Sequence, residues 1–286
     1  FTATSATCVT GLVLHDTALY WSPFGQLVIL LLIQVGGMGV VTIAVAIFMF
    51  AGKRIGVKQR WVMQESISAP QVGGIVRMTG FILKTAFLIE GIGALLLALR
   101  FCPQFGLGRG LWYAVFHSVS AFCNAGFDLM GVNSPFSSLT DYVGDPLVSN
   151  VIAFLIIIGG VGFLTWNDIR EHKLHFRRYR LQILTGLLFF LLYEFEQGQW
   201  VDMSLWERIN AAFFQSVTPR TAGFNTVDLT GLSQPAQLLI ILLMLVGGSP
   251  GSTAGGFKTT TLAVMLLGIR AVFRHKERPQ CFGRRI

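Results

Sequence analysis

The sequence predicts an all-α polytopic membrane protein built from repeated units of helix, re-entrant loop and helix. Of the 286 residues, 53% are hydrophobic and 13% are charged, whereas a soluble domain carries about 25% charged residues. The 24 Phe and 32 Gly residues suit helices that pack closely in lipid. The third observation is a glycine-containing motif that recurs between apolar runs.

The apolar runs predict the spanning helices in order. About 17–25 apolar residues cross a bilayer, and the predicted spans are residues 24–51, 78–99, 147–166 and the shorter 181–195. Two shorter pieces, residues 235–248 and 259–273, flank GGSPGSTAGGFKT, which is too rich in Gly and Ser to be helical. The run 78–99 carries Lys84 and Glu90, which we expect to face the protein interior or an interface.

The net charge of +8 comes from basic residues clustered in three segments. Sixteen of the 22 Lys and Arg residues lie in residues 51–77, 167–180 and 268–286. Such an excess marks cytoplasmic loops, so these segments are predicted to lie on the inner face. Nucleic-acid binding would need a basic face with stacking aromatic residues, so no nucleic-acid partner is expected.

Two stretches of intermediate polarity, residues 111–127 and 206–224, open like helices and end in Ala-Gly-Phe. The basic segments place both ends of each stretch on the outer side, so each stretch is predicted to be a re-entrant loop. Non-helical backbone is tolerated at membrane depth only where protein buries it or where it lines a wet cavity.

The loops belong to a repeat. The motif SAxCxxG occurs at residues 5–11 and 120–126, and Ala-Gly-Phe occurs at 125–127 and 222–224. Each loop is followed by an apolar run with a glycine pair: Gly36-Gly37, Gly159-Gly160 and Gly247-Gly248. The chain is therefore predicted to hold three repeats, namely residues 1–60 (loop and second helix), 61–170 (helix, loop, helix) and 171–286 (helix, loop, broken second helix).

Loops of this kind indicate passage of a monovalent cation. A ring of backbone carbonyls replaces the water around such an ion, and Gly permits the backbone angles that this requires. A helix before each loop points its negative end at the centre. The alternative interpretation is that the Gly-rich segments only pack helices together, which three similar loops on one side disfavour.

Four stretches, SATCVTGL, HSVSAFCNAGF, QSVTPRTAGFNT and GGSPGSTAGGFKTTT, resemble the membrane subunit of the Trk/Ktr/HKT superfamily of potassium transporters, the Ktr type in particular. The resemblance covers almost the entire chain. It implies repeats of helix, pore loop and helix around a pseudo-fourfold pore. It also implies K⁺ as the transported ion, with Na⁺ as the alternative, and no covalently bound cofactor.

The resemblance assigns the site residues as well. Backbone carbonyls of three loops would form the selectivity filter and bind K⁺: Cys8, Val9, Thr10 and Gly11; Cys123, Asn124, Ala125 and Gly126; Thr221, Ala222 and Gly223. Gly11 favours potassium, because Ser at this position weakens the preference in the superfamily. A gate loop inside the membrane would comprise Gly247, Gly248, Ser249, Pro250, Gly251, Ser252, Thr253, Ala254, Gly255, Gly256 and Lys258.

The resemblance implies a homodimer of membrane subunits in the bacterial inner membrane. It also implies a cytosolic nucleotide-binding ring subunit that controls the gate. The three basic segments are candidate docking surfaces for that ring, and contact with anionic lipid is an equally favoured alternative.

Three other interpretations are weighed. GGSPG fits the hydrolase motif GxSxG, but Pro250 follows the Ser and has no N–H for an oxyanion hole, so no enzyme is expected. A secondary cation transporter with broken helices usually has inverted repeats, whereas these copies share one orientation. The family's opening helix and fourth repeat have no counterpart here, so an inactive fragment is the third alternative.

Overall fold

The chain is mostly helical. The structure, a computed structural model, describes residues 1–39, 42–43, 47, 56, 61–62, 64, 75–163, 166, 184–195, 197–273, 280–281 and 284–285. Most of the three basic segments lie outside these residues, so their cytoplasmic position stays a prediction.

The first part of the chain carries six α-helices within the described residues: α1 (Thr2–Thr7), α2 (Thr17–Tyr20), α3 (Pro23–Met38), α6 (Ile75–Phe105), α7 (Leu107–Phe122) and α8 (Pro146–Val161). Two short 3₁₀ turns, Met130–Val132 and Thr140–Tyr142, lie between α7 and α8. The helix expected at the start of residues 111–127 is confirmed as α7, which begins four residues earlier; its re-entrant path stays a prediction.

The second part begins with a helix at Leu184–Glu194, whose last turn, Phe190–Glu194, is a π-helix. A 3₁₀ turn (Gly198–Trp200), α11 (Leu205–Val217), α12 (Gln234–Leu245) and α13 (Thr259–Phe273) follow. The strands β1 (Gln280–Cys281) and β2 (Arg284–Arg285) pair antiparallel. This two-residue pairing is a small departure from the all-α prediction.

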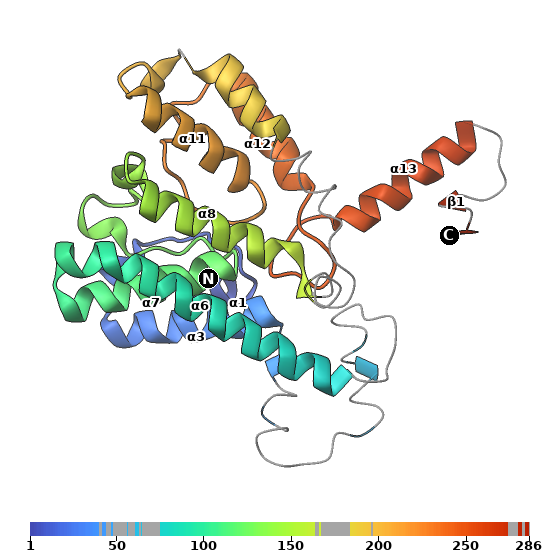
Figure 1. Ribbon diagram of the computed structural model, residues 1–286, viewed down its shortest axis with the longest axis horizontal. Coiled ribbons are helices and arrows are strands. Elements are labelled where there is room, and N and C mark those ends of the chain that lie inside the picture. Colours follow the sequence, from blue (N-terminus) through green and yellow to red (C-terminus); the bar gives the residue numbers. More distant parts are fainter. Residues whose placement is uncertain are drawn as a thin grey trace.

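The helices stack side by side, with α8 near the middle (Figure 1). Helix α7 packs against α3, α6 and α8, and α8 also packs against α11. Helix α13 extends away from this stack (Figure 1). The loops that follow α1, α7 and α11 are thereby brought into one region.

Three of the apolar helices begin with the same local signal, a capping side chain followed by proline. The side chains of Ser22, Asp145 and Ser233 accept hydrogen bonds from the first-turn amides of α3, α8 and α12. Proline stands in the first turn of each helix, where its missing N–H costs nothing. This shared start supports the predicted repeat.

Two predicted spans, 24–51 and 147–166, are each broken at a glycine, α3 at Gly39 (φ +83°) and α8 at Gly162 (φ +93°). The N–H groups of Ile43 and Trp166 donate to the carbonyls of these two glycines, and the described residues there are again helical. Glycine adopts such positive φ values without the steric cost that other residues meet. Each glycine closes a GGxG sequence, residues 36–39 and 159–162, so the predicted glycine pairs were only part of the signal.

The other predicted helices are confirmed in type and approximate position. Within the described residues, Met78–Phe105 is long and apolar enough to cross a bilayer, judged by length and composition. Helices α3, α8, Leu184–Glu194, α12 and α13 are apolar but have 10–17 residues each.

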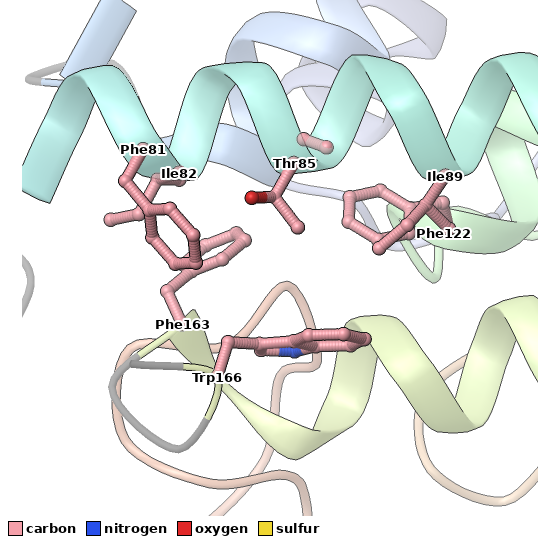
Figure 2. Close-up of a pocket in the computed structure, with 8 residues that line it drawn as sticks. Phe81, Ile82, Thr85, Ile89, Phe122, Phe163 and Trp166 are labelled. Atoms are coloured by element: carbon pink, nitrogen blue, oxygen red, sulfur yellow. The ribbon is translucent and has the colours of Figure 1, made fainter. Parts of the chain in front are cut away.

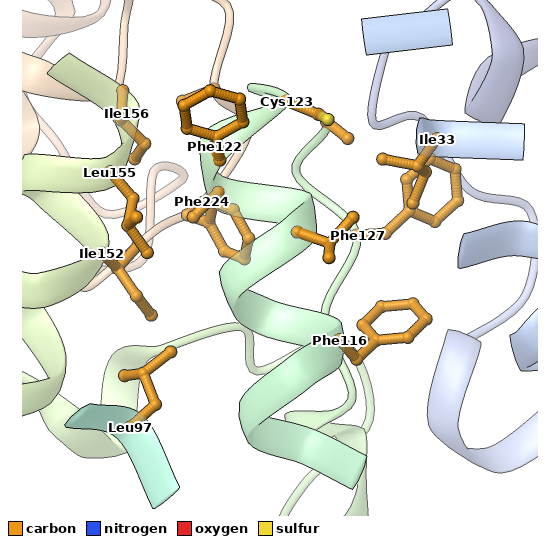
Figure 3. Close-up of a cluster of buried hydrophobic side chains, with 14 of the residues drawn as sticks. Ile33, Leu97, Phe116, Phe122, Cys123, Phe127, Ile152, Leu155, Ile156 and Phe224 are labelled. Carbon is orange, nitrogen blue, oxygen red and sulfur yellow. The ribbon is translucent and has the colours of Figure 1, made fainter. Parts of the chain in front are cut away.

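The main hydrophobic core surrounds α7 and the loop that follows it (Figure 3). Phe116, Phe122 and Phe127 are at most 2% exposed and belong to the same core cluster as Ile152 and Ile156 of α8. Phe224, from the loop after α11, joins the same core. The core thus encloses the segments that were predicted to carry the site.

Candidate functional site

The three predicted loops have the same backbone signature. We call residues 8–11 loop one, 123–126 loop two and 221–223 loop three. In each loop a residue with a side chain and the glycine two positions later both have positive φ: Val9 (+55°) and Gly11 (+77°), Asn124 (+55°) and Gly126 (+71°), Thr221 (+61°) and Gly223 (+78°). Positive φ is rare for residues other than Gly, and a β-branched residue there is an outlier.

The glycines of the three loops meet. A Cβ atom built on Gly11 would lie 2.6 Å from the carbonyl oxygen of Ala125, and one on Gly126 would lie 2.7 Å from that of Ala222. A Cβ on Gly223 would lie 2.9 Å from the Cα of Gly126. Backbone therefore approaches backbone from loop one to loop two and from loop two to loop three.

The SAxCxxG motif explains the matching shapes of loops one and two. The N–H of Thr10 donates to the Ser5 carbonyl at 2.9 Å, and the N–H of Ala125 donates to the Ser120 carbonyl at 2.8 Å. Both bonds span five residues and close the loop over the end of the preceding helix. Loop three leaves α11 differently, since its Ala222 N–H donates to Thr218.

Hydroxyl groups fix the residue after each glycine in loops two and three. Ser120 Oγ donates to the Phe127 carbonyl at 2.7 Å, and Thr218 Oγ1 donates to the Phe224 carbonyl at 2.5 Å. Neither hydroxyl residue was among the predicted site residues, although a Ser or Thr shortly before each loop is a signal visible in the sequence.

His117 lies behind loop two. It is fully buried, and its Nε2 accepts a hydrogen bond from the Leu129 N–H at 3.3 Å. Its Nδ1 lies 2.7 Å from the Tyr113 carbonyl. Since Nε2 accepts, Nδ1 carries the proton and donates, so the neutral ring ties α7 to the chain beyond loop two.

The glycine pairs pack against the ends of the loop helices. A Cβ on Gly36 would lie 2.0 Å from the Thr7 carbonyl oxygen, and one on Gly159 would lie 2.0 Å from that of Phe122. Thr7 and Phe122 are equivalent positions in the motif, each just before the cysteine. In the third repeat, Gly247 instead meets the Gly255 carbonyl, at 1.8 Å, because α12 ends there.

The residues predicted as a gate lie directly against loops two and three. Thr253 Oγ1 is 2.9 Å from the Phe122 carbonyl and 3.2 Å from Asn124 Oδ1. The N–H of Gly255 donates to Thr221 Oγ1 at 2.7 Å. Asn124 Nδ2 in turn donates to the Arg220 carbonyl at 3.1 Å. We call residues 247–258 the glycine-rich loop.

The end of α8 holds the other side of the glycine-rich loop. The N–H groups of Ser249 and Thr253 donate to the carbonyls of Gly160 and Gly159 at 3.2 and 3.3 Å. Within the loop, Lys258 Nζ donates to the Ala254 carbonyl at 2.6 Å. The glycine-rich loop is thus hydrogen-bonded to loops two and three on one side and to the end of α8 on the other.

A polar cavity of about 140 Å³ lies against the three glycines. Asp16, Asp128 and Ser138 line it together with Gly11, Gly126 and Gly223. The Asp16 carboxylate also accepts hydrogen bonds from the N–H groups of Ala18, Leu19 and Phe136. Burial raises the pKa of Asp128 to about 6, opposed by a hydrogen bond from Met130 and aided by the charge of Asp16.

A second cavity, between α6, the end of α7 and the residues just beyond α8, is too small for a ligand. It holds about 10 Å³ and is lined by Phe81, Ile89, Phe122, Phe163 and Trp166, among others (Figure 2). Its apolar walls back Phe122 at the end of α7. The structure therefore brings together the residues that the sequence assigned to the three loops and to the gate, and the polar cavity above them was not predicted.

The family model TrkH, described as cation transport protein, matches residues 1–194 and 174–286. The potassium/sodium uptake protein NtpJ of Enterococcus hirae is 40% identical over 296 residues, which are 100% of this chain and 64% of that protein. The Ktr system potassium uptake protein B of Bacillus subtilis is 40% identical over 298 residues, 100% of this chain and 66% of that protein.

Among solved structures, the crystal structure of the potassium transporter TrkH from Vibrio parahaemolyticus resembles the fold. The TM-score is 0.66 at 21% identity, and the match covers 96% of this chain and 54% of that one. The chain thus spans about two thirds of the length of the two curated relatives.

Proposed function

Because the chain belongs to the TrkH family of cation transport proteins, we propose that it is the ion-conducting part of a potassium-uptake transporter. One observation carries this proposal: three loops with paired positive-φ residues meet at Gly11, Gly126 and Gly223. The names of two relatives, a potassium/sodium and a potassium uptake protein, agree with K⁺ as cargo and with Na⁺ as the alternative.

The proposed filter uses backbone carbonyls of loops one, two and three. In each loop, two residues with positive φ are separated by one residue. This alternation turns the intervening peptide planes, so that successive carbonyls can point to the same side of the loop. The helices α1, α7 and α11 end at these loops, so their negative ends favour a cation there. Asp16 and Asp128 in the outer cavity concentrate cations before they enter.

The glycine-rich loop is the proposed gate. Its position against Asn124 and Thr221 puts it in contact with two of the three filter loops. Opening would require breaking hydrogen bonds to Phe122, Asn124 and Thr221 while those to α8 hold the loop in place. Gly251 and Gly256, with φ of +64° and +71°, supply hinge positions.

The proposed assembly follows from the family. The three repeats form walls of a pseudo-fourfold pore in the bacterial inner membrane, and two such subunits form a homodimer. A cytosolic nucleotide-binding ring subunit docks on the inner face through the basic segments and controls the gate.

The test is rubidium uptake into potassium-starved bacteria that lack their own uptake systems, with the protein expressed from its complete coding sequence. We expect uptake that depends on this protein. Gly126→Ser and Gly223→Ser should abolish uptake per molecule of protein present in the membrane, because a side chain at either position meets backbone and strains a left-handed residue. Uptake that these substitutions leave intact would refute the filter assignment.

A further inference from the structure

A polar cluster is buried among the helices behind loop two. Glu90 of α6 is 5% exposed, and both of its carboxyl oxygens lie 3.0 Å from Nε2 of Gln34 in α3. Its backbone carbonyl accepts a hydrogen bond from Ser118 Oγ of α7 at 2.6 Å. One residue therefore joins three helices.

The cluster also contacts the first residue of loop two. The thiol of Cys123 is fully buried and lies 4.0 Å from Glu90 Oε1. On another side, a Cβ on Gly37 of α3 would lie only 2.5 Å from the same sulfur. Cys123 is thus enclosed by α3 and the Glu90 carboxyl at the point where α7 ends and loop two begins.

A carboxyl group at this place is costly. Glu90 lies inside Met78–Phe105, the helix best suited to cross a membrane, and ionisable residues at that depth are expensive and mark function. Gln34 Oε1 adds to the cost, because it is buried and has no hydrogen-bond partner within the described part of the chain. Two apolar side chains at these positions would be buried at a lower cost in free energy. The polar pair therefore has a role that packing does not explain.

We propose that Glu90 and Gln34 are positioning residues for loop two and thereby set the ion selectivity of uptake. The inference rests on the proposed function, since it takes the loop-two carbonyls as ion ligands. Glu90 acts through Cys123 and does not bind the ion. Selectivity depends on where the carbonyls stand and how firmly they are held, so a displaced loop two would discriminate less between potassium and sodium.

The test compares rubidium and sodium uptake by variants expressed from the complete coding sequence. Gln34→Leu and Glu90→Asp should each lower the rubidium-to-sodium uptake ratio roughly fivefold, about the effect of one lost hydrogen bond. Glu90→Gln should stay within about twofold of wild type, because its amide accepts from Gln34 Nε2 and donates to the open Gln34 Oε1. Lys84→Gln, on the exposed side of α6, is the matched control and should change nothing.

Two outcomes would overturn the inference. One is an unchanged ratio in both Gln34→Leu and Glu90→Asp. The other is a loss in Glu90→Gln as large as in Glu90→Asp, which would assign the effect to charge and not to position.

A second measurement does not depend on transport. The rate at which a permeant maleimide modifies Cys123, followed by mass spectrometry of its peptide, should rise in Glu90→Asp and stay at the wild-type level in Glu90→Gln. Equal rates in all three proteins would refute the positioning role. If wild-type protein shows no uptake, the proposed function fails, and this labelling result still decides whether Glu90 holds loop two.

Discussion

At the scale of single residues, the site is marked by strain. Val9, Asn124 and Thr221 hold φ values of +55°, +55° and +61°, each at a cost of about 1–3 kcal/mol. Such conformations persist only where the surroundings fix them. Those surroundings are present in loops two and three, where Asn124 bonds to Arg220 and Thr221 bonds to Gly255.

Asp128 allows a residue-scale test of the outer cavity. Asp128→Asn removes one negative charge beside Gly126, so we expect the rubidium concentration for half-maximal uptake to rise roughly two- to fivefold, the effect of one charge at a partly solvated site. The maximal rate should change less, since the filter backbone is untouched. Asp202→Asn, at an exposed position outside the cavity, is the matched control. An unchanged half-saturation in Asp128→Asn would contradict the assigned role of the cavity.

The residues that form the three loops could be predicted from the sequence, but several of the residues that contact them could not. SAxCxxG and Ala-Gly-Phe indicated which residues share a conformation, because a left-handed glycine leaves a direct trace in sequence. The contact of Glu90 with Gln34 joins residues 56 positions apart. Such a contact depends on how helices pack, and one sequence without relatives carries no record of that.

At the scale of elements, the packing of α8 on α7 depends on a missing side chain. Gly159→Ala would place a methyl group 2.0 Å from the Phe122 carbonyl oxygen and 2.7 Å from Thr253 Oγ1. Backbone cannot yield cheaply, so we expect a loss of stability of more than about 3 kcal/mol. The measurement is the melting temperature of the detergent-purified protein together with its abundance in the membrane.

Gly268→Ala is the control for that substitution. It makes the same change in α13, where a Cβ meets nothing within 4 Å. Alanine is the better helix former by about 1 kcal/mol, so this variant should be as stable as wild type or more stable. Equal melting temperatures for Gly159→Ala and wild type would mean that α8 does not pack on loop two as described.

The glycine-rich loop gives a second test at this scale. Thr253→Val keeps the shape of the side chain but removes the hydroxyl that contacts Phe122 and Asn124. If the glycine-rich loop is the gate and the conformation described here is the closed one, the substitution lowers the stability of the closed conformation by about 1 kcal/mol. Basal rubidium uptake in the absence of activating nucleotide should then rise several-fold, whereas Thr260→Val at an exposed position of α13 should not. Unchanged or reduced basal uptake in Thr253→Val would count against the gate.

Helix existence was easier to predict than helix ends. The apolar runs predicted α3, α6, α8, α12 and α13, because burial in lipid demands apolar side chains regardless of neighbours. The breaks at Gly39 and Gly162 were not predicted, since apolar residues continue past both glycines and a hydropathy average does not register a single residue with positive φ. The position of the glycine-rich loop was predicted from its Gly and Ser content, whereas its role as a gate came from the family resemblance.

At the scale of the whole molecule, apolar side chains cover much of the outside. Leu88, Leu95 and Leu99 of α6 are 64–67% exposed, and Val272 and Phe273 of α13 are 73% and 82% exposed. Water would disfavour such a surface, whereas lipid accommodates it. The distribution agrees with a chain that belongs to a family of cation transport proteins.

The predicted orientation can be tested in intact cells. Ser134→Cys places a thiol in the exposed segment between α7 and α8, which is predicted to face outward with the loops and the outer cavity. Arg178→Cys places one in the basic segment 167–180, which is predicted to face the cytoplasm. A membrane-impermeant maleimide should label Ser134→Cys in intact cells and Arg178→Cys only after permeabilisation, with the wild-type chain as background for its native thiols. Labelling of Arg178→Cys in intact cells would invert the topology, and the loops would then open inward and the glycine-rich loop outward.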